Sequence, residues 1–127
     1  MATDKIQLGA SEGGIIEEGS NANGSWTKWA DGRMECQGSI TGEYDVSVTR
    51  GSMFIRYGPT ITYPQTFITP PVVHSSYEST NGSTDDRDYF TTAATPNTTQ
   101  CSTCIWSPVS KGSSVHVINW TATGRWK

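Results

Sequence analysis

The sequence predicts an all-β protein, a small antiparallel β-sandwich. Charged residues make up only 17% of the 127 residues, whereas Trp, Tyr and Phe together number thirteen. Polar composition with many aromatics and Thr is typical of strands rather than helices. No stretch of about twelve residues repeats its apolar side chains with a helical period. Short apolar-alternating segments separated by turn signals every eight to twelve residues or so indicate a sandwich or barrel.

Seven or eight short strands are expected. They lie in residues 25–30, 33–40, 44–48, 52–57, 62–73, 88–94, 101–107 and 113–126. Prolines at the start of a strand do least harm, because the missing N–H would carry no ladder bond there. This suits Pro64, Pro70 and Pro71.

The stretch "GSWTKWADGRMECQG" predicts the first hairpin. Asp31-Gly32 favours a two-residue type I′ turn, because the pair tolerates two positive φ values. The outgoing strand places its apolar residues on one face, toward the core: Met34, Cys36 and Ile40. Trp26 and Trp29 have opposite parity, so one packs in the core and the other faces an edge, an interface or a site.

The chain divides into an acidic extended arm, residues 1–24, and a β-sandwich domain, residues 25–127. The arm holds one lysine against four carboxylates, so it carries the whole net charge of −3 and the domain is neutral. Without a basic stripe, nucleic acid is not an expected partner. Membrane insertion is not expected, since no run approaches the ~20 apolar residues of a span. The opening "MATDKIQLGA" lacks the apolar region of a signal peptide, which predicts either a cytosolic chain at synthesis or one that leaves its cell by a route other than secretion.

The cysteines and histidines are weak candidates for chemistry. Cys101 and Cys104 form a CxxC, which suits half a zinc site or a redox pair. Further zinc ligands would have to come from Cys36, His74 or His116. His116 alternates with Ile118 and Trp120, which predicts a histidine on the core side or at an interface. Because the CxxC lies in strand-like sequence, its two thiols are expected on opposite faces, one buried and one partly exposed. We expect no metal, no cofactor and no catalytic residue.

The polar loop at residues 78–88 and an exposed aromatic suggest a saccharide site. Loops on a rigid β scaffold often carry function. Asp85 and Asp86 can accept hydrogen bonds from sugar hydroxyls, and Arg87 can donate to them. Trp106 offers a ring on which a sugar face can stack. A solvated loop tip, ordinary packing of the tryptophan, and a glycosidase carboxylate pair remain alternatives.

Two stretches resemble known families. "GIIEEGSNANGSWTKWADGRMECQG" resembles the opening of C-terminal domains on phage tail fibres and prophage tail proteins, with Gln37 in place of their usual Trp. The second half, "FITPPVVHSSYES…DDRDYF…CIWSPVS…SSVHVINWTATGRW", is similar to H-type lectins, in which an "F…PPVV" strand and the closing strand bracket the sugar site. Together the two stretches cover most of residues 14–126.

The resemblance implies a homotrimeric antiparallel sandwich whose sugar site lies between subunits. Arg87 and Trp106 match the family's contact residues, and Ser107 stands where the animal lectins usually have His. The expected function is a non-enzymatic receptor-binding module of a phage tail fibre or tip. It would bind a host-surface carbohydrate, belong to the virion tail and assemble in the host cytoplasm, with residues 1–24 a candidate docking segment for another tail protein. A structural trimeric tail or cap protein without ligand and a polysaccharide depolymerase are the alternatives.

Overall fold

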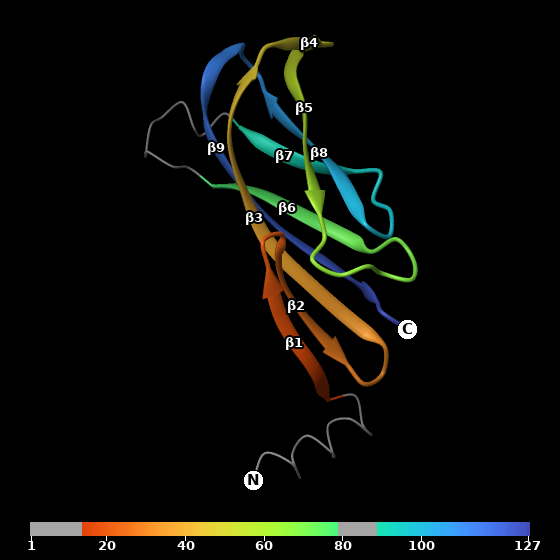
Figure 1. Ribbon diagram of the computed structural model, residues 1–127. Helices are drawn as coiled ribbons and strands as arrows, with labels where there is room; N and C mark the ends of the chain where they lie inside the picture. Colours follow the sequence, from red (N-terminus) through yellow and green to blue (C-terminus); the bar gives the residue numbers. More distant parts are fainter. Residues whose placement is uncertain (1–13, 79–88) are drawn as a thin grey trace.

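The computed structural model describes residues 14–78 and 89–127 (Figure 1). This part of the chain forms nine β-strands and holds no helix, so no helix in it could cross a membrane. The strands are β1 Ile15–Asn21, β2 Gly24–Trp29, β3 Arg33–Val46, β4 Val48–Arg50, β5 Met53–Thr62, β6 Val72–Glu78, β7 Phe90–Ala94, β8 Gln100–Ser107 and β9 Lys111–Arg125.

The strands build two antiparallel sheets. The five-stranded sheet has the order β1-β2-β3-β9-β6, and the four-stranded sheet has the order β4-β5-β8-β7. The two sheets face each other, with the β1–β2 hairpin and β4 at opposite ends of the molecule (Figure 1). The predicted fold class, a small antiparallel β-sandwich, is confirmed.

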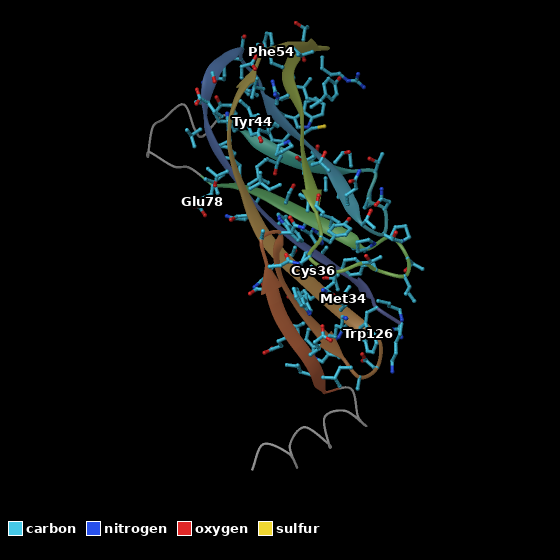
Figure 2. The ribbon with its side chains drawn as sticks, viewed as in Figure 1. Met34, Cys36, Tyr44, Phe54, Glu78 and Trp126 are labelled. Atoms are coloured by element: carbon cyan, nitrogen blue, oxygen red, sulfur yellow. The ribbon has the colours of Figure 1, made fainter. Side chains whose placement is uncertain are left out.

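The core follows the two-residue alternation that the sequence displays. Met34 and Cys36 on β3 are fully buried, as predicted (Figure 2). They belong to the larger core cluster, whose buried members are Met34, Cys36, Ile61, Tyr63, Phe67, Cys101, Trp120 and Ala122. A smaller cluster at the other end of the sandwich contains Val46, Tyr89, Ile105 and Ile118.

The turn between β2 and β3 has three residues, so the predicted two-residue type I′ turn is wrong. The register pairs Lys28 with Met34, which leaves residues 30–32 outside the two strands. Only Gly32 takes a positive φ, of 100°. The Asp31 side chain caps the turn by accepting the Arg33 N–H at 3.0 Å. A three-residue loop that ends in a positive-φ glycine is the next most common hairpin connection.

The strands predicted at residues 33–40 and 44–48 are largely one strand, β3. Thr41 and Gly42 read as a break because glycine weakens a strand. However, β9 runs to fifteen residues and pairs with β3 continuously from Arg33 to Tyr44. The ring of Tyr44 covers Gly42, where an added Cβ would lie 2.5 Å from the tyrosine hydroxyl.

The segment expected as an arm takes part in the sheet over its described part. Ile15–Asn21 forms β1, which pairs with β2 and makes the hairpin an edge of the five-stranded sheet. Glu17 accepts a hydrogen bond from Trp26 Nε1 at 2.8 Å and lies 3.4 Å from Lys28 Nζ. The Trp26 bond, followed by the Lys28 contact, lowers the pKa of Glu17 below its usual value. The boundary expected at residue 24 therefore falls inside a hairpin.

Glycines make room for aromatic rings on the inner face of the five-stranded sheet. A Cβ on Gly19 would overlap the Trp26 ring, and a Cβ on Gly38 would lie 2.9 Å from the Trp120 ring. Each ring lies across the glycine of a neighbouring strand, an arrangement that compensates for the missing side chain. Trp26 thus packs toward the core. The Arg33 guanidinium lies over the Trp29 ring, with its Cζ 4.1 Å from the centre of that ring.

Candidate functional site

The acidic loop predicted to bind a sugar lies outside the described residues. Asp85, Asp86 and Arg87 all fall within residues 79–88. The structure describes the residues on either side of this segment. Glu78 is exposed at the end of β6 (Figure 2), and Tyr89 is buried just before β7. Because these strands are edges of different sheets, the segment connects the two layers of the sandwich.

Trp106 is half-buried on the outer face of the four-stranded sheet. It pairs with Phe90 on β7, and their ring centres lie 6.2 Å apart with planes only 6° from parallel. Trp106 Nε1 donates to the Thr92 hydroxyl at 3.0 Å. This bond satisfies the indole N–H and fixes the orientation of the ring. The side of β8 that carries Trp106 therefore presents two nearly parallel aromatic rings.

The Trp106–Phe90 pair belongs to an apolar row that crosses all four strands of this sheet. In order from β4 to β7 the row consists of Val48, Ile55, Trp106 and Phe90. Val48 and Phe90, on the edge strands β4 and β7, are 50% and 45% exposed. Ile55, on the interior strand β5, is 1% exposed and belongs to neither core cluster. We call these four residues the apolar row. At the β7 end of the row, the half-exposed Phe90 and the half-buried Trp106 leave apolar ring surface accessible, and contiguous surface of this kind can bind a partner or a ligand.

Ser107, predicted beside Trp106 in the site, lies on the opposite face. The residue is fully buried, and its hydroxyl donates to the Val109 carbonyl at 2.6 Å and accepts the Val109 N–H at 3.2 Å. Successive side chains of a strand point to opposite faces. Trp106 and Ser107 therefore cannot form one surface, and Ser107 has no exposed atom to offer a ligand.

The CxxC behaves as a structural pair of thiols. Cys101 is 1% exposed and lies in the larger core cluster, whereas Cys104 is half-buried on the other face of β8. The predicted division into one buried and one partly exposed thiol is confirmed. Burial raises the pKa of Cys101, and it raises the pKa of Cys36 to about 11. Within the part of the chain that the structure describes, no three His, Cys, Asp or Glu side chains gather as a metal site.

The two histidines point to opposite faces of the five-stranded sheet. His116 is fully buried, with its ring centre 4.6 Å from Tyr89 and 5.4 Å from Tyr77. Its Nε2 lies 3.1 Å from the Tyr44 carbonyl oxygen. His116 is thus a core histidine, one of the two roles that its alternation with Ile118 predicted. His74, by contrast, is exposed on the outer face of β6.

That outer face contains a hollow of about 690 Å³, which no sequence motif indicated. It extends from the β1–β2 turn across β3 and β9 to β6. Most of its lining residues have uncharged polar side chains. The full lining consists of Ser20, Asn21, Ala22, Asn23, Gly24, Ser25, Gln37, Gly38, Ser39, His74, Ser75, Ser76, Asn119, Trp120 and Thr121. The sequence signalled this face only by polar residues at alternate positions of the strands. Such residues are equally typical of a strand face that is simply exposed to solvent.

No protein-family model matches the chain, and a search of curated proteins found no match either. Two solved structures are similar in fold. A C-terminal fragment of the P. aeruginosa R1 pyocin fibre gives a TM-score of 0.60 at 18% identity, over 87% of this chain and 29% of that fragment. An N-truncated R1-type pyocin tail fibre gives a TM-score of 0.60 at 18% identity, over 98% of this chain and 96% of its own. This chain therefore has the fold of these tail-fibre fragments and spans less than a third of the longer one.

Proposed function

We propose that the protein is a non-enzymatic receptor-binding module of a phage-type tail fibre and that it recognises a host-surface carbohydrate. The Trp106–Phe90 pair carries the proposal, because two nearly parallel, accessible rings offer a face on which a pyranose can stack. The similarity of fold to the R1 pyocin fibre fragments supports the tail-fibre setting. Location in the virion tail and assembly in the host cytoplasm belong to the same proposal.

Arg87, Asp85 and Asp86 complete the proposed site. Arg87 stands three positions before Phe90 in the chain. Covalent geometry alone keeps their Cα atoms within roughly 11 Å of each other, since an extended chain advances at most about 3.6 Å per residue. A guanidinium can reach two hydroxyls at once, and the carboxylates can accept from others. Ser107 is left out of the proposed site because it is buried on the inner face.

We further propose that the module is a homotrimer. The apolar row leaves Val48 and Phe90 about half exposed, and Tyr57 on the same sheet is 56% exposed. Residues 25–127 carry no net charge, so no overall repulsion opposes association. A sugar site between subunits would place the exposed rings against a neighbouring copy as well as against the ligand. Residues 1–24 remain the proposed docking segment toward another tail protein.

The same row favours a second candidate function, a structural tail subunit that binds no ligand. In that case the Trp106–Phe90 pair would lie wholly within the contact between copies. A polysaccharide depolymerase is a third candidate that no described arrangement of carboxylates favours. The oligomer and the ligand must therefore be measured on the same variants.

The test is a glycan array with the wild-type chain and three alanine variants, at Trp106, Phe90 and Arg87. Val115, which is 46% exposed on the outer face of the other sheet, provides the matched control variant Val115→Ala. We expect Arg87→Ala to weaken binding by about 1–3 kcal/mol, the range for a hydrogen bond to a charged group, and Trp106→Ala to weaken it without changing which sugars bind.

Light scattering on each variant separates the candidates. Lost glycan binding in a Trp106→Ala protein that remains trimeric supports the receptor-binding function. A Trp106→Ala protein that falls to monomers, together with an empty array for the wild type, supports the structural subunit. Release of sugar fragments from a surface polysaccharide would support the depolymerase and contradict the proposal.

A further inference from the structure

The hollow on the outer face of the five-stranded sheet lies away from the apolar row. The register places its side chains in rows across the strands. Ser25, Gln37, Thr121 and His74 form one row, and Ser39, Asn119 and Ser76 form the next. These side chains point away from the core, because Cys36 and Trp120 at alternate positions are buried on the other face. The hollow and Trp106 therefore lie on opposite outer faces of the sandwich.

We propose that this hollow is a second binding site and that its ligand is an uncharged saccharide. None of the described residues that line it is an aspartate, glutamate, lysine or arginine. The lining offers an anion no lysine or arginine, and it offers a metal ion no carboxylate of its own, since the neighbouring Glu78 carboxylate accepts a hydrogen bond from Asn119. Amides and hydroxyls both donate and accept hydrogen bonds, as the hydroxyls of a sugar do. A volume of about 690 Å³ lies within the range of small-molecule sites.

Several polar groups in the hollow are held in place before any ligand arrives. Asn119 Nδ2 donates to Glu78 Oε1 at 2.9 Å, which orients the amide. Asn21 Nδ2 donates to the Pro64 carbonyl at 3.2 Å, and Asn21 Oδ1 accepts the Asn23 N–H at 2.8 Å. These bonds fix the β1–β2 turn as a rim. A site whose groups are already ordered loses less entropy on binding.

The floor of the hollow is closely packed from the core side and carries short side chains. The Trp120 ring packs against Gly38 from the core side, so closely that a Cβ on Gly38 would lie 2.9 Å from it. On the outer side, four serines line the hollow, at positions 20, 25, 39 and 76. Short side chains over a packed floor leave the space that longer ones would occupy. His74 adds an exposed flat ring at the β6 edge, beside which a sugar ring can lie.

Ser39→Trp tests the proposal by filling the hollow, and Thr41→Trp is its matched control. Both residues are exposed on the same face of β3, but only Ser39 lines the hollow. The probes are neutral monosaccharides and trisaccharides built from glucose, galactose, mannose or N-acetylglucosamine, titrated into the full-length chain and followed by NMR. We expect at least one probe to bind with a dissociation constant of about 1 mM or tighter. Ser39→Trp should weaken that binding about tenfold or more, and Thr41→Trp should leave it within about twofold.

His74→Ala keeps the test decisive if Ser39→Trp fails to fold. The exposed imidazole can be removed without opening the core, and binding should weaken several-fold. Absence of binding by every probe, or binding that survives both Ser39→Trp and His74→Ala, would overturn the proposal. A change of oligomeric state in Ser39→Trp but not in Thr41→Trp would also overturn it, because another copy would then occupy the hollow.

The outcome is independent of the site at Trp106. Binding lost in Trp106→Ala but unchanged in Ser39→Trp would leave the proposed receptor function standing and reject the second site. Binding lost in Ser39→Trp but unchanged in Trp106→Ala would establish the hollow and move the receptor site there. Loss of different probes in the two variants would establish two sites.

Discussion

Gly38→Ala should destabilise the protein because the Trp120 ring occupies the space of its Cβ. The new methyl carbon would lie 2.9 Å from Trp120 Cζ2, 3.0 Å from Nε1 and 3.0 Å from the Asn23 carbonyl oxygen. Unstrained contacts between heavy atoms lie at about 3.5–4.0 Å, so three atoms must each give way by roughly half an ångström or more. Trp120 is 3% exposed and packs against Tyr63 at 6.1 Å between ring centres, which hinders its retreat.

Two opposing effects set the magnitude. Overpacking a filled site costs typically about 1–3 kcal/mol. Replacing glycine restricts the unfolded chain and returns about 0.4–1 kcal/mol. We therefore expect a net loss of about 1–2 kcal/mol in the free energy of unfolding. Gly112→Ala is the control, because nothing lies within 4 Å of a Cβ there, and it should be neutral or slightly stabilising.

A double-mutant cycle with Trp120→Phe isolates the contact. The phenyl ring lacks the outer part of the indole, so Gly38→Ala should cost about 1 kcal/mol less in that background. Denaturant unfolding at one fixed protein concentration measures all four proteins, since oligomerisation makes stability concentration-dependent. An equal cost of Gly38→Ala in both backgrounds, or a Gly38→Ala as mild as Gly112→Ala, would refute the reasoning.

Three further outcomes follow from the buried thiols and the first turn. Gly32→Val should lower the free energy of unfolding by about 1–3 kcal/mol, as measured by denaturant unfolding. A β-branched residue resists the φ of 100°, and its Cβ would meet the Arg125 side chain. A cost no larger than that of Gly112→Ala would contradict this. In the native protein a thiol reagent near pH 8 should modify Cys104 much faster than Cys36 or Cys101, and mass spectrometry of the labelled peptides would show any other order. Because burial raises the pKa of Cys36 from 9.0 to about 11, the folded state keeps a proton that the unfolded chain has lost. Stability should then fall by up to about 3 kcal/mol as pH rises from 9 to 11, and Cys36→Ala should flatten that slope in pH-dependent unfolding.

The sequence alone determined which residues face the core. The alternation along residues 101–107 separated Cys101 from Cys104, and the alternation along 113–126 placed His116 with Ile118. The structure bears out both, as well as the burial of Met34 and Cys36. These predictions succeeded because the side-chain period of a strand is local and needs no knowledge of the neighbouring strand. The all-β class followed from the same local signal.

Only the tertiary structure decided how the strands meet. The register with β9 joined two predicted strands into β3, and the register with β2 set three residues in the first turn. It also placed Trp26 across Gly19 and Trp120 across Gly38. The hollow arises in the same way, from residues as distant in sequence as Ser20 and Thr121. Each serine or asparagine that lines it looks locally like any solvent-facing strand residue, because the shape of a surface depends on the alignment and twist of several strands at once.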